Sequence, residues 1–355
     1  MRRYCNPSNL FRFSFCLFVA ILLGCSNPTH FTQDEIVYLA EGADGHFQLF
    51  ALDPFDPNPK QLTNLHRDIF EFAISPQGFV AFTLIDEDQS NDIWLLWDDE
   101  PEPIPLADCG PEKGCKNPQW SPTQNLLIYE QIPIRNGALV ADDAQLWWYD
   151  LEAFQSIPVF SDETLQGREA RFSADGTLLT YLVPNLDEIH VYHLKTNEVG
   201  VIQSRANVAA LWGEGDELFI SALTVVNHRT AIHIFKTDSR GNELVNLTGR
   251  EKAVEDGGYA LSPNGELVAF TRKPPGGNVG KQIWLMNPDG SEQRSLTDEL
   301  SIQHGALSWN SAGSHLLFQR FDLAQPSRLP EIWLIDVTTG EATFIIEGTR
   351  PQFAP

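Results

Sequence analysis

The residues best suited to chemistry occupy two positions that recur along the chain, four and two residues before a Ser-Pro-type turn. The first position holds Glu71, Asn117, Glu169, Ala209, Gly258, His304 and Arg350. The second holds Ala73, Gln119, Arg171, Leu211, Ala260, Ala306 and Gln352. The residues between the two positions are mostly apolar or small, as at Phe72 and Pro118, which is the alternation of a strand with one polar face. We expect the polar members to meet at one surface. As candidate binding residues we select Glu71, Asn117, Gln119, Glu169, Arg171, His304, Arg350 and Gln352.

These side chains suit two kinds of ligand. Carboxylate and imidazole groups bind divalent cations, so Glu71, Glu169 and His304 form a candidate metal set. Arg171 and Arg350 suit an anionic ligand, because guanidinium groups bind carboxylates and phosphates. The alternative is a solvated lining whose charges neutralise one another in pairs.

Other catalytic signatures are weak. A peptidase of the α/β-hydrolase type needs a Gly-x-Ser-x-Gly turn, and the sequence has none. His190, His193 and His233 lie in apolar strand patterns, where packing is the commoner role. We therefore expect a protein that binds rather than catalyses.

The positions recur because the chain is built from repeats. Residues 261–297 show the unit clearly: four short β-rich runs separated by the turns Ser-Pro-Asn-Gly and Asn-Pro-Asp-Gly. The third run recurs seven times, beginning at Gln48, Asp92, Gln145, Glu188, Ala231, Gln282 and Glu331. A four-stranded unit of 40–50 residues repeated in this way is typical of a β-propeller. We predict an all-β fold, a seven-bladed propeller of four-stranded antiparallel blades over residues 35–355.

The two ends of the repeat array complement each other. The first unit begins at Ile36 with the pattern of a second strand, and no Ser-Pro turn precedes it. The chain ends in Pro-Gln-Phe-Ala-Pro, residues 351–355, which matches the opening strand of the third unit, residues 118–122. The C-terminal strand is therefore expected to complete the first blade and close the ring.

The segment from Ser262 to Thr297 resembles the repeat of the TolB-type propeller, a WD40-like architecture. TolB-like propellers include a periplasmic protein of the Tol envelope system, modules of prolyl-oligopeptidase-type peptidases, and sugar lyases. The resemblance thus implies a fold and leaves the function open. TolB itself has an additional N-terminal domain, and only about ten residues separate Cys25 from the first unit here.

The N-terminus has the pattern of a secretion signal. Arg2 and Arg3 precede an apolar run, residues 13–23, which is shorter than the roughly 20 residues that span a bilayer. Leu-Leu-Gly-Cys, ending at Cys25, resembles the bacterial lipobox, which implies that Cys25 carries a lipid. The predicted organisation is a lipoprotein signal peptide at 1–24, a tether at 25–34 and the propeller thereafter. The alternative is an ordinary signal peptide with an incidental cysteine.

Cys109 and Cys115 are the other cysteines of the mature chain. An extracytoplasmic compartment permits a disulfide between them, and a zinc site would need more ligands than these two. Their loop, together with the long segments 84–91, 131–144, 272–281 and 319–330, is expected on the face where the innermost strands begin. Asp86, Glu87, Asp88, Asp142 and Asp143 make that face acidic, which suits calcium, although no EF-hand spacing is present.

The charge of the chain excludes one class of partner. The formal net charge is −24, and it becomes −27 when the first 24 residues are removed. Such a surface repels phosphate backbones, so we expect no nucleic-acid binding.

Together these patterns predict a monomeric, extracytoplasmic scaffold held at the cell membrane or outer membrane only by its lipid. It would bind an envelope protein or glycan through the long-loop face. The alternative is a metal-dependent lyase or hydrolase that acts on acidic sugars at the channel mouth.

Overall fold

The computed structural model describes residues 31–54, 56, 58–87, 90–97, 102–162, 164–249 and 252–355. Cys25, the predicted signal segment and Asp88 lie outside these residues. The regular structure is almost all β, with two single-turn 3-10 helices, η1 (Ala141–Asp143) and η2 (Pro184–Leu186). Within the described ranges, no helix has the length and apolar character needed to cross a membrane.

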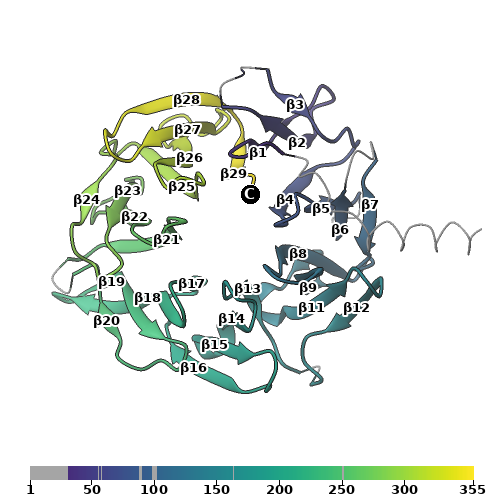
Figure 1. Cartoon of the computed structure of the whole chain (residues 1–355), viewed down its shortest axis with the longest axis horizontal. Helices are drawn as coiled ribbons and strands as arrows, with labels where there is room; N and C mark the ends of the chain where they lie inside the picture. The colour runs from purple at the N-terminus through teal and green to yellow at the C-terminus, as the bar shows by residue number, and fades with distance from the viewer. Residues whose placement is uncertain are drawn as a thin grey trace, which may run out of the picture.

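The strands form successive antiparallel meanders around a central axis, with one strand of each nearest the centre (Figure 1). In order from the centre outward, the first contains β29 (Thr349–Phe353), β1 (Ile36–Glu41), β2 (Phe47–Leu52) and β3 (Lys60–Gln61). The next contains β4 (Ile69–Ile74), β5 (Val80–Ile85), β6 (Asn91–Leu96) and β7 (Ile104–Ala107). It is followed by β8 (Lys113–Trp120), β9 (Leu126–Arg135), β11 (Gln145–Asp150) and β12 (Gln155–Pro158), with β10 (Ala138–Leu139) paired to β9.

The remaining meanders follow the same plan. One contains β13 (Arg168–Phe172), β14 (Leu178–Val183), β15 (Glu188–His193) and β16 (Val199–Gln203). The next contains β17 (Leu211–Trp212), β18 (Glu217–Val226), β19 (Arg229–Asp238) and β20 (Val245–Asn246). The last two contain β21 (Glu255–Leu261), β22 (Val268–Lys273), β23 (Gln282–Met286) and β24 (Arg294–Ser295), then β25 (Ile302–Trp309), β26 (His315–Asp322), β27 (Glu331–Asp336) and β28 (Ala342–Glu347).

Two parallel bridges join neighbouring meanders into larger sheets. Asn91 of β6 pairs with Gly114 of β8, and Ile232 of β19 pairs with Glu255 of β21. The number of hydrogen-bonded sheets therefore differs from the number of repeat units, and the count of seven blades stays a prediction.

The ring closes as the sequence predicts. β29, from the C-terminus, pairs antiparallel with β1, with Phe353 opposite Ile36 and Gln352 opposite Val37. The amide of Phe353 also donates to Ser308 Oγ of β25, at 3.1 Å. The last strand is thus bonded on one side to the first meander and on the other to the last.

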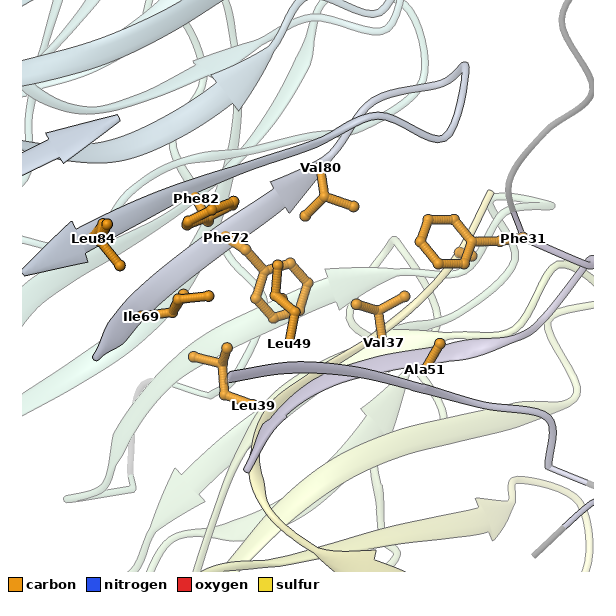
Figure 2. Close-up of a cluster of buried hydrophobic side chains, with 11 residues drawn as sticks. Phe31, Val37, Leu39, Leu49, Ala51, Ile69, Phe72, Val80, Phe82 and Leu84 are labelled. Atoms are coloured by element: carbon orange, nitrogen blue, oxygen red, sulfur yellow. The ribbon is translucent and has the colours of Figure 1, made fainter. Parts of the chain in front are cut away.

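The core lies between adjacent blades rather than inside any one of them. In one cluster Val37 and Leu49 from the first meander pack against Phe72, Val80 and Phe82 from the next (Figure 2). Both faces of these strands are buried because each blade is covered by a neighbour on each side, which explains the nearly continuous apolar runs in the second strands.

Tryptophans at the ends of three inner strands tie blades together through their ring N–H. Trp120, Trp212 and Trp309 each donate from Nε1 to a carbonyl of the preceding inner strand, at 3.0 Å. The acceptors are Ala73, Arg171 and Ala260. The equivalent position in the first blade is Phe353, whose backbone makes the contact to Ser308 instead.

Residues 31–34, which were expected to belong to the tether, pack against the propeller. The Phe31 side chain is buried in the cluster of Figure 2, beside Val37. Asp34 accepts hydrogen bonds from the amide and the hydroxyl of Ser311, and Gln33 Nε2 donates to the same hydroxyl. This segment, which we call the strap, runs from the first two blades to the turn between β25 and β26, so the predicted tether is shorter than the sequence suggested.

We predict that removal of residues 349–355 destabilises the protein strongly. The deletion leaves β1 without its inner partner and exposes the buried Ile36 and Tyr38, so the free energy of unfolding should drop by at least about 3 kcal/mol. Urea unfolding followed by tryptophan fluorescence measures the change. Removal of the exposed Pro355 alone is the control, and an equally small effect of both deletions would contradict the closure.

Candidate functional site

A β-bulge near the start of most inner strands places the predicted site residues. The strand register shifts by one residue between Lys116 and Gln119, and likewise between Arg168 and Arg171. The extra residue has a left-handed backbone at Asn117 (φ 56°), Glu169 (φ 53°), Gly258 (φ 58°), Ala306 (φ 51°) and Arg350 (φ 54°). A bulge removes one amide from the ladder of the strand, so that amide needs another acceptor.

Side chains of the preceding blade supply this acceptor at several bulges. Glu71 Oε1 accepts from the amide of Asn117 at 2.7 Å. Glu130 Oε1 accepts from the amide of Glu169 at 2.6 Å and from Asn117 Nδ2 at 2.7 Å. Glu71, Asn117 and Glu169 therefore belong to one hydrogen-bonded chain that spans three blades.

Glu130, on β9, is the member of this chain that the sequence analysis missed. Its side chain is buried, and burial is the main reason that its pKa is raised to about 7. The nearby carboxylates of Glu169 and Glu71 raise this pKa further, whereas the two hydrogen bonds lower it. The spacing before the Ser-Pro-type turns reveals only inner-strand residues, and Glu130 lies on the second strand.

Gln319 of β26 occupies the position equivalent to Glu130 and is uncharged. Its Oε1 accepts from the amide of Arg350 at 3.0 Å and from Thr349 Oγ1 at 2.8 Å. The repeat can therefore satisfy a bulge with a neutral amide, and the buried charge of Glu130 is not required for that hydrogen bond.

Arg350 joins a second cluster at the start of the inner strands. Its guanidinium lies 3.9 Å from Glu71 Oε2 and 4.8 Å from the ring centroid of Phe70. The Lys116 ammonium lies 4.3 Å from the same centroid. Phe70 is 38% exposed, so an aromatic ring flanked by two cations faces solvent here.

A cavity lies across the channel from the Arg350 and Phe70 cluster. A cavity of about 640 Å³ lies along the inner strands of three blades. Its walls include Glu169, Arg171, Val208, Ala209, Gly258 and Tyr259. Glu169 and Arg171 form an ion pair at 3.2 Å, with both side chains 33% exposed. The cavity lies where β17 is only two residues long and where small residues, Ala209 before β17 and Gly258 on β21, line the wall.

Tyr259 fixes one wall of this cavity. Its hydroxyl donates to the carbonyl of Ala209 at 2.8 Å and accepts from the amide of Ser221 at 3.1 Å. Burial raises the pKa of Tyr259 to about 12, so the phenol stays protonated at neutral pH. The ring therefore serves as a fixed apolar surface between two blades.

The two predicted glutamines lie on the inner strands as expected. Gln352 Nε2 donates to the carbonyl of Phe72 at 3.3 Å, and Gln119 pairs with Ile128 of β9. Both are half-buried. A binding role for either residue stays a prediction.

His304 is not equivalent to Glu71, Asn117 and Glu169, although the alignment of the repeats on their turns predicts that it is. The turn of the last blade begins at Asn310, whose amide bonds to the carbonyl of His315, so the bulge residue of that blade is Ala306. His304 is buried two residues earlier, with Nδ1 donating to the carbonyl of Lys281 at 2.9 Å. Burial lowers the pKa of His304, which favours the neutral ring. The alignment by Ser308 was wrong by two residues.

A metal set of Glu71, Glu169 and His304 is not supported by the geometry. Within the described residues, no group of three or more His, Cys, Asp or Glu side chains is arranged to bind a metal ion. The acidic loop residues have basic partners: Asp86 pairs with Arg67, Asp142 with Arg168, and Asp143 with Arg135. A divalent cation, calcium included, therefore stays a prediction without a formed site.

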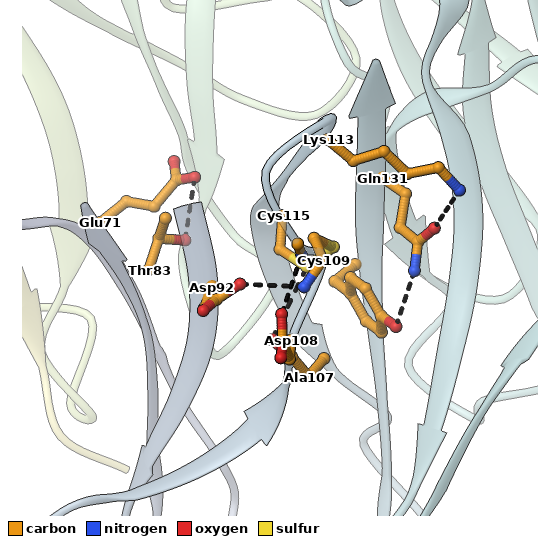
Figure 3. The surroundings of a disulfide bond; sticks show 11 residues. Glu71, Thr83, Asp92, Ala107, Asp108, Cys109, Lys113, Cys115 and Gln131 are labelled. Atoms are coloured by element: carbon orange, nitrogen blue, oxygen red, sulfur yellow. Dashed lines mark hydrogen bonds between the residues drawn. A yellow bond between two sulfur atoms is a disulfide. The ribbon is translucent and has the colours of Figure 1, made fainter. Parts of the chain in front are cut away.

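Cys109, in the loop between β7 and β8, forms a disulfide with Cys115 of β8, and their Cα atoms are 5.8 Å apart (Figure 3). Asp92 Oδ1 accepts from the amide of Cys109 at 2.9 Å, which attaches the loop to β6. The loop is thus held at two points beside the second and third blades.

The fold and the channel define a β-propeller, and comparison with known proteins identifies its type. No family model matches the sequence, and no curated protein matches it. Among solved structures, TolB from Acinetobacter baumannii is similar with a TM-score of 0.57 and 14% identity, over 97% of this chain and 71% of that one. The fold is therefore that of a TolB-like propeller.

Structures with other names share this fold. An oligogalacturonate lyase in complex with manganese has a TM-score of 0.61 and 15% identity, over 89% of this chain and 86% of the lyase. A puromycin-hydrolyzing peptidase from Mycobacterium tuberculosis has a TM-score of 0.64 and 15% identity, over 90% of this chain, which spans only 53% of the peptidase. At this identity the similarity establishes the fold alone.

We predict that Glu130→Gln makes stability less dependent on pH. The raised pKa means that the folded protein retains a proton on Glu130 between about pH 4.5 and 7, which the unfolded chain has released. The stabilisation is complete at low pH and is lost as pH rises through 7, by roughly 3 kcal/mol in total. The variant keeps the acceptor oxygen and should lose this slope.

The measurement is the free energy of unfolding by urea at pH 5 and pH 8. Gln319→Glu is the reverse variant, since it introduces a carboxylate at the equivalent position, which is half-buried, and should create a smaller slope of the same sign. Equal slopes for the native protein and Glu130→Gln would contradict the assignment.

Proposed function

We propose that this chain is an envelope lipoprotein that binds a protein or glycan partner in its channel and does not catalyse a reaction. The observation that carries the proposal is the division of the channel. Glu71 and Glu130 are engaged in bonds between blades, while small and apolar residues beside the Glu169–Arg171 pair leave a cavity of about 640 Å³. A fixed, partly apolar cavity with a few polar groups is the usual form of a binding site.

The polar side chains of the wall suit recognition better than proton transfer. Glu71 lies near the Arg350 guanidinium and accepts the amide of the bulge residue Asn117. Glu169 is itself a bulge residue and pairs with Arg171. Each carboxylate is therefore held in one position. Fixed charges of both signs select a partner by complementarity. TolB from Acinetobacter baumannii shares this fold, which supports the envelope location proposed from the lipobox.

The second candidate is a metal-dependent lyase or hydrolase that acts on acidic sugars at the channel mouth. It is favoured by three cations along the channel, Lys116, Arg171 and Arg350, and by the shared fold with a manganese-bound lyase. It lacks a converging set of metal ligands within the described part of the chain.

We predict that Val208→Trp abolishes partner binding. Val208 lines the cavity, and an indole placed there would fill much of the space without changing the charge. The matched control is Val199→Trp on the exposed outer strand β16, where the side chain is 47% exposed. A photo-crosslinking residue at Asn207, in the cavity, should give a partner adduct that Val208→Trp removes and Val199→Trp leaves intact.

The same preparations discriminate the second candidate. Turnover of acidic oligosaccharides with manganese or calcium, together with no adduct from Asn207, would overturn the binding proposal in favour of the enzyme. Adducts that persist at full yield in Val208→Trp would show that the partner binds elsewhere on the propeller.

A further inference from the structure

The strap fixes where the chain enters the propeller. Phe31 is buried between the first two blades, and Asp34 is bonded to Ser311 in the turn between β25 and β26. The backbone then pairs into the ring, because the amide of Ala354 donates to the carbonyl of Glu35. Residues 31–36 are therefore part of the folded body.

This entry point lies on one defined face. In every antiparallel meander the inner strand ends, and the second strand begins, at the same side, which carries the turns at residues 75–79 and 310–314. We call this the turn face. The inner strands begin at the other side, the mouth face, which carries Phe70, Lys116 and the loop between β5 and β6.

The chain available upstream of the strap is short. Six peptide steps connect Cys25 to Phe31. An extended chain covers at most about 3.5 Å per residue, so Phe31 can lie no further than roughly 21 Å from Cys25.

If the mouth face lay against the membrane, the tether would have to follow a longer path from Phe31 to the lipid. The tether would first have to pass two further strands, β2 and β3, to the rim, roughly 10 Å at the spacing of neighbouring strands. It would then follow the height of a six-residue strand such as β5, roughly 20 Å. The path of roughly 30 Å exceeds the reach of the tether.

We propose that the lipid at Cys25 keeps the turn face toward the membrane and directs the mouth face toward the aqueous compartment. This inference rests on the lipid anchor of the proposed function and adds the class of partner. The channel mouth meets soluble proteins or glycans of the envelope, and it does not meet the bilayer that carries the anchor.

The charge of the turn face indicates that this face is not attracted to the membrane surface. Exposed acidic residues there include Asp175, Glu214, Asp216, Glu266 and Asp289. Anionic headgroups repel such a surface, so the orientation comes from the short covalent link rather than from attraction to lipid.

Two thiols at opposite ends of β5 test the orientation. Gln77, in the turn before β5, and Glu87, in the loop after it, are both exposed. Each is replaced by Cys and labelled with a fluorophore, and the lipidated protein is added to preformed phosphatidylcholine vesicles that carry a headgroup acceptor. Cys109 and Cys115 are oxidised, so the introduced thiol is labelled selectively.

The expected result is stronger energy transfer from Gln77→Cys than from Glu87→Cys, by at least about two-fold for labels separated by roughly 20 Å along the strand. Equal energy transfer from the two labels, or stronger transfer from Glu87→Cys, would overturn the proposed orientation. Neither result would contradict the lipid anchor. A tether lengthened by twelve Gly and Ser residues after Pro28 should abolish the difference, because a long flexible linker reaches around the rim.

The anchor is tested separately by vesicle flotation. The native protein should float with the vesicles and Cys25→Ser should not. If the native protein fails to float, the anchor in the proposed function is wrong and the orientation falls with it.

Discussion

The β-bulge of the inner strands is the constraint on which the channel depends. Each bulge turns one amide out of its own ladder, and a buried amide without an acceptor is costly. The second strand of the preceding blade meets this need with Glu130 at Glu169 and with Gln319 at Arg350. The same bond thus joins two blades and fixes a side chain on the channel wall. Residues that look like a ligand-binding ring from sequence alone are also the residues that connect the ring.

This constraint also explains why the channel is uneven. Where the bulge residue is Asn117, Glu169 or Arg350, a polar side chain projects from the bulge. Where it is Gly258, no side chain projects and the wall is open. The shortened β17 extends the open side, and the cavity lies there. One structural device with variable residues therefore produces both polar and open stretches of the channel wall.

The sequence predicted the architecture because strand alternation and turn residues are local signals. The closing pair of β29 with β1 was predictable from the matching of residues 351–355 with residues 118–122. The errors were shifts of two residues. In the last blade the sequence pattern predicts Ser308 as the turn residue, whereas the turn begins at Asn310. In the fifth blade the sequence pattern aligns Ala231 with Gln282, whereas the structure makes His233 equivalent to Gln282. The amide of Ile234 donates to Thr248 Oγ1 in the same way as the amide of Ile283 donates to Thr297 Oγ1.

A shift of two residues leaves every side chain on the same face of its strand, so the hydrophobic pattern cannot reveal it. Only the turn hydrogen bonds fix the register, and these depend on which residue closes the turn. Glu130 was out of reach for a different reason. Its role comes from the neighbouring blade, through the Glu169 amide, and no spacing within its own repeat signals that contact.

The seam of the ring and the entry of the chain coincide in the first blade. β29 closes the seam from the C-terminal side, and the strap crosses it from the N-terminal side, since Asp34 bonds to Ser311 in the last blade. A propeller is most easily opened where its two ends meet, because that contact has no covalent continuity. Force from an anchored tether would act first on the Phe31 packing and on the Asp34–Ser311 bonds, because both precede β1 along the chain. In an anchored protein, the strap would therefore take the pull of the tether before the pairing of β29 with β1 that closes the ring.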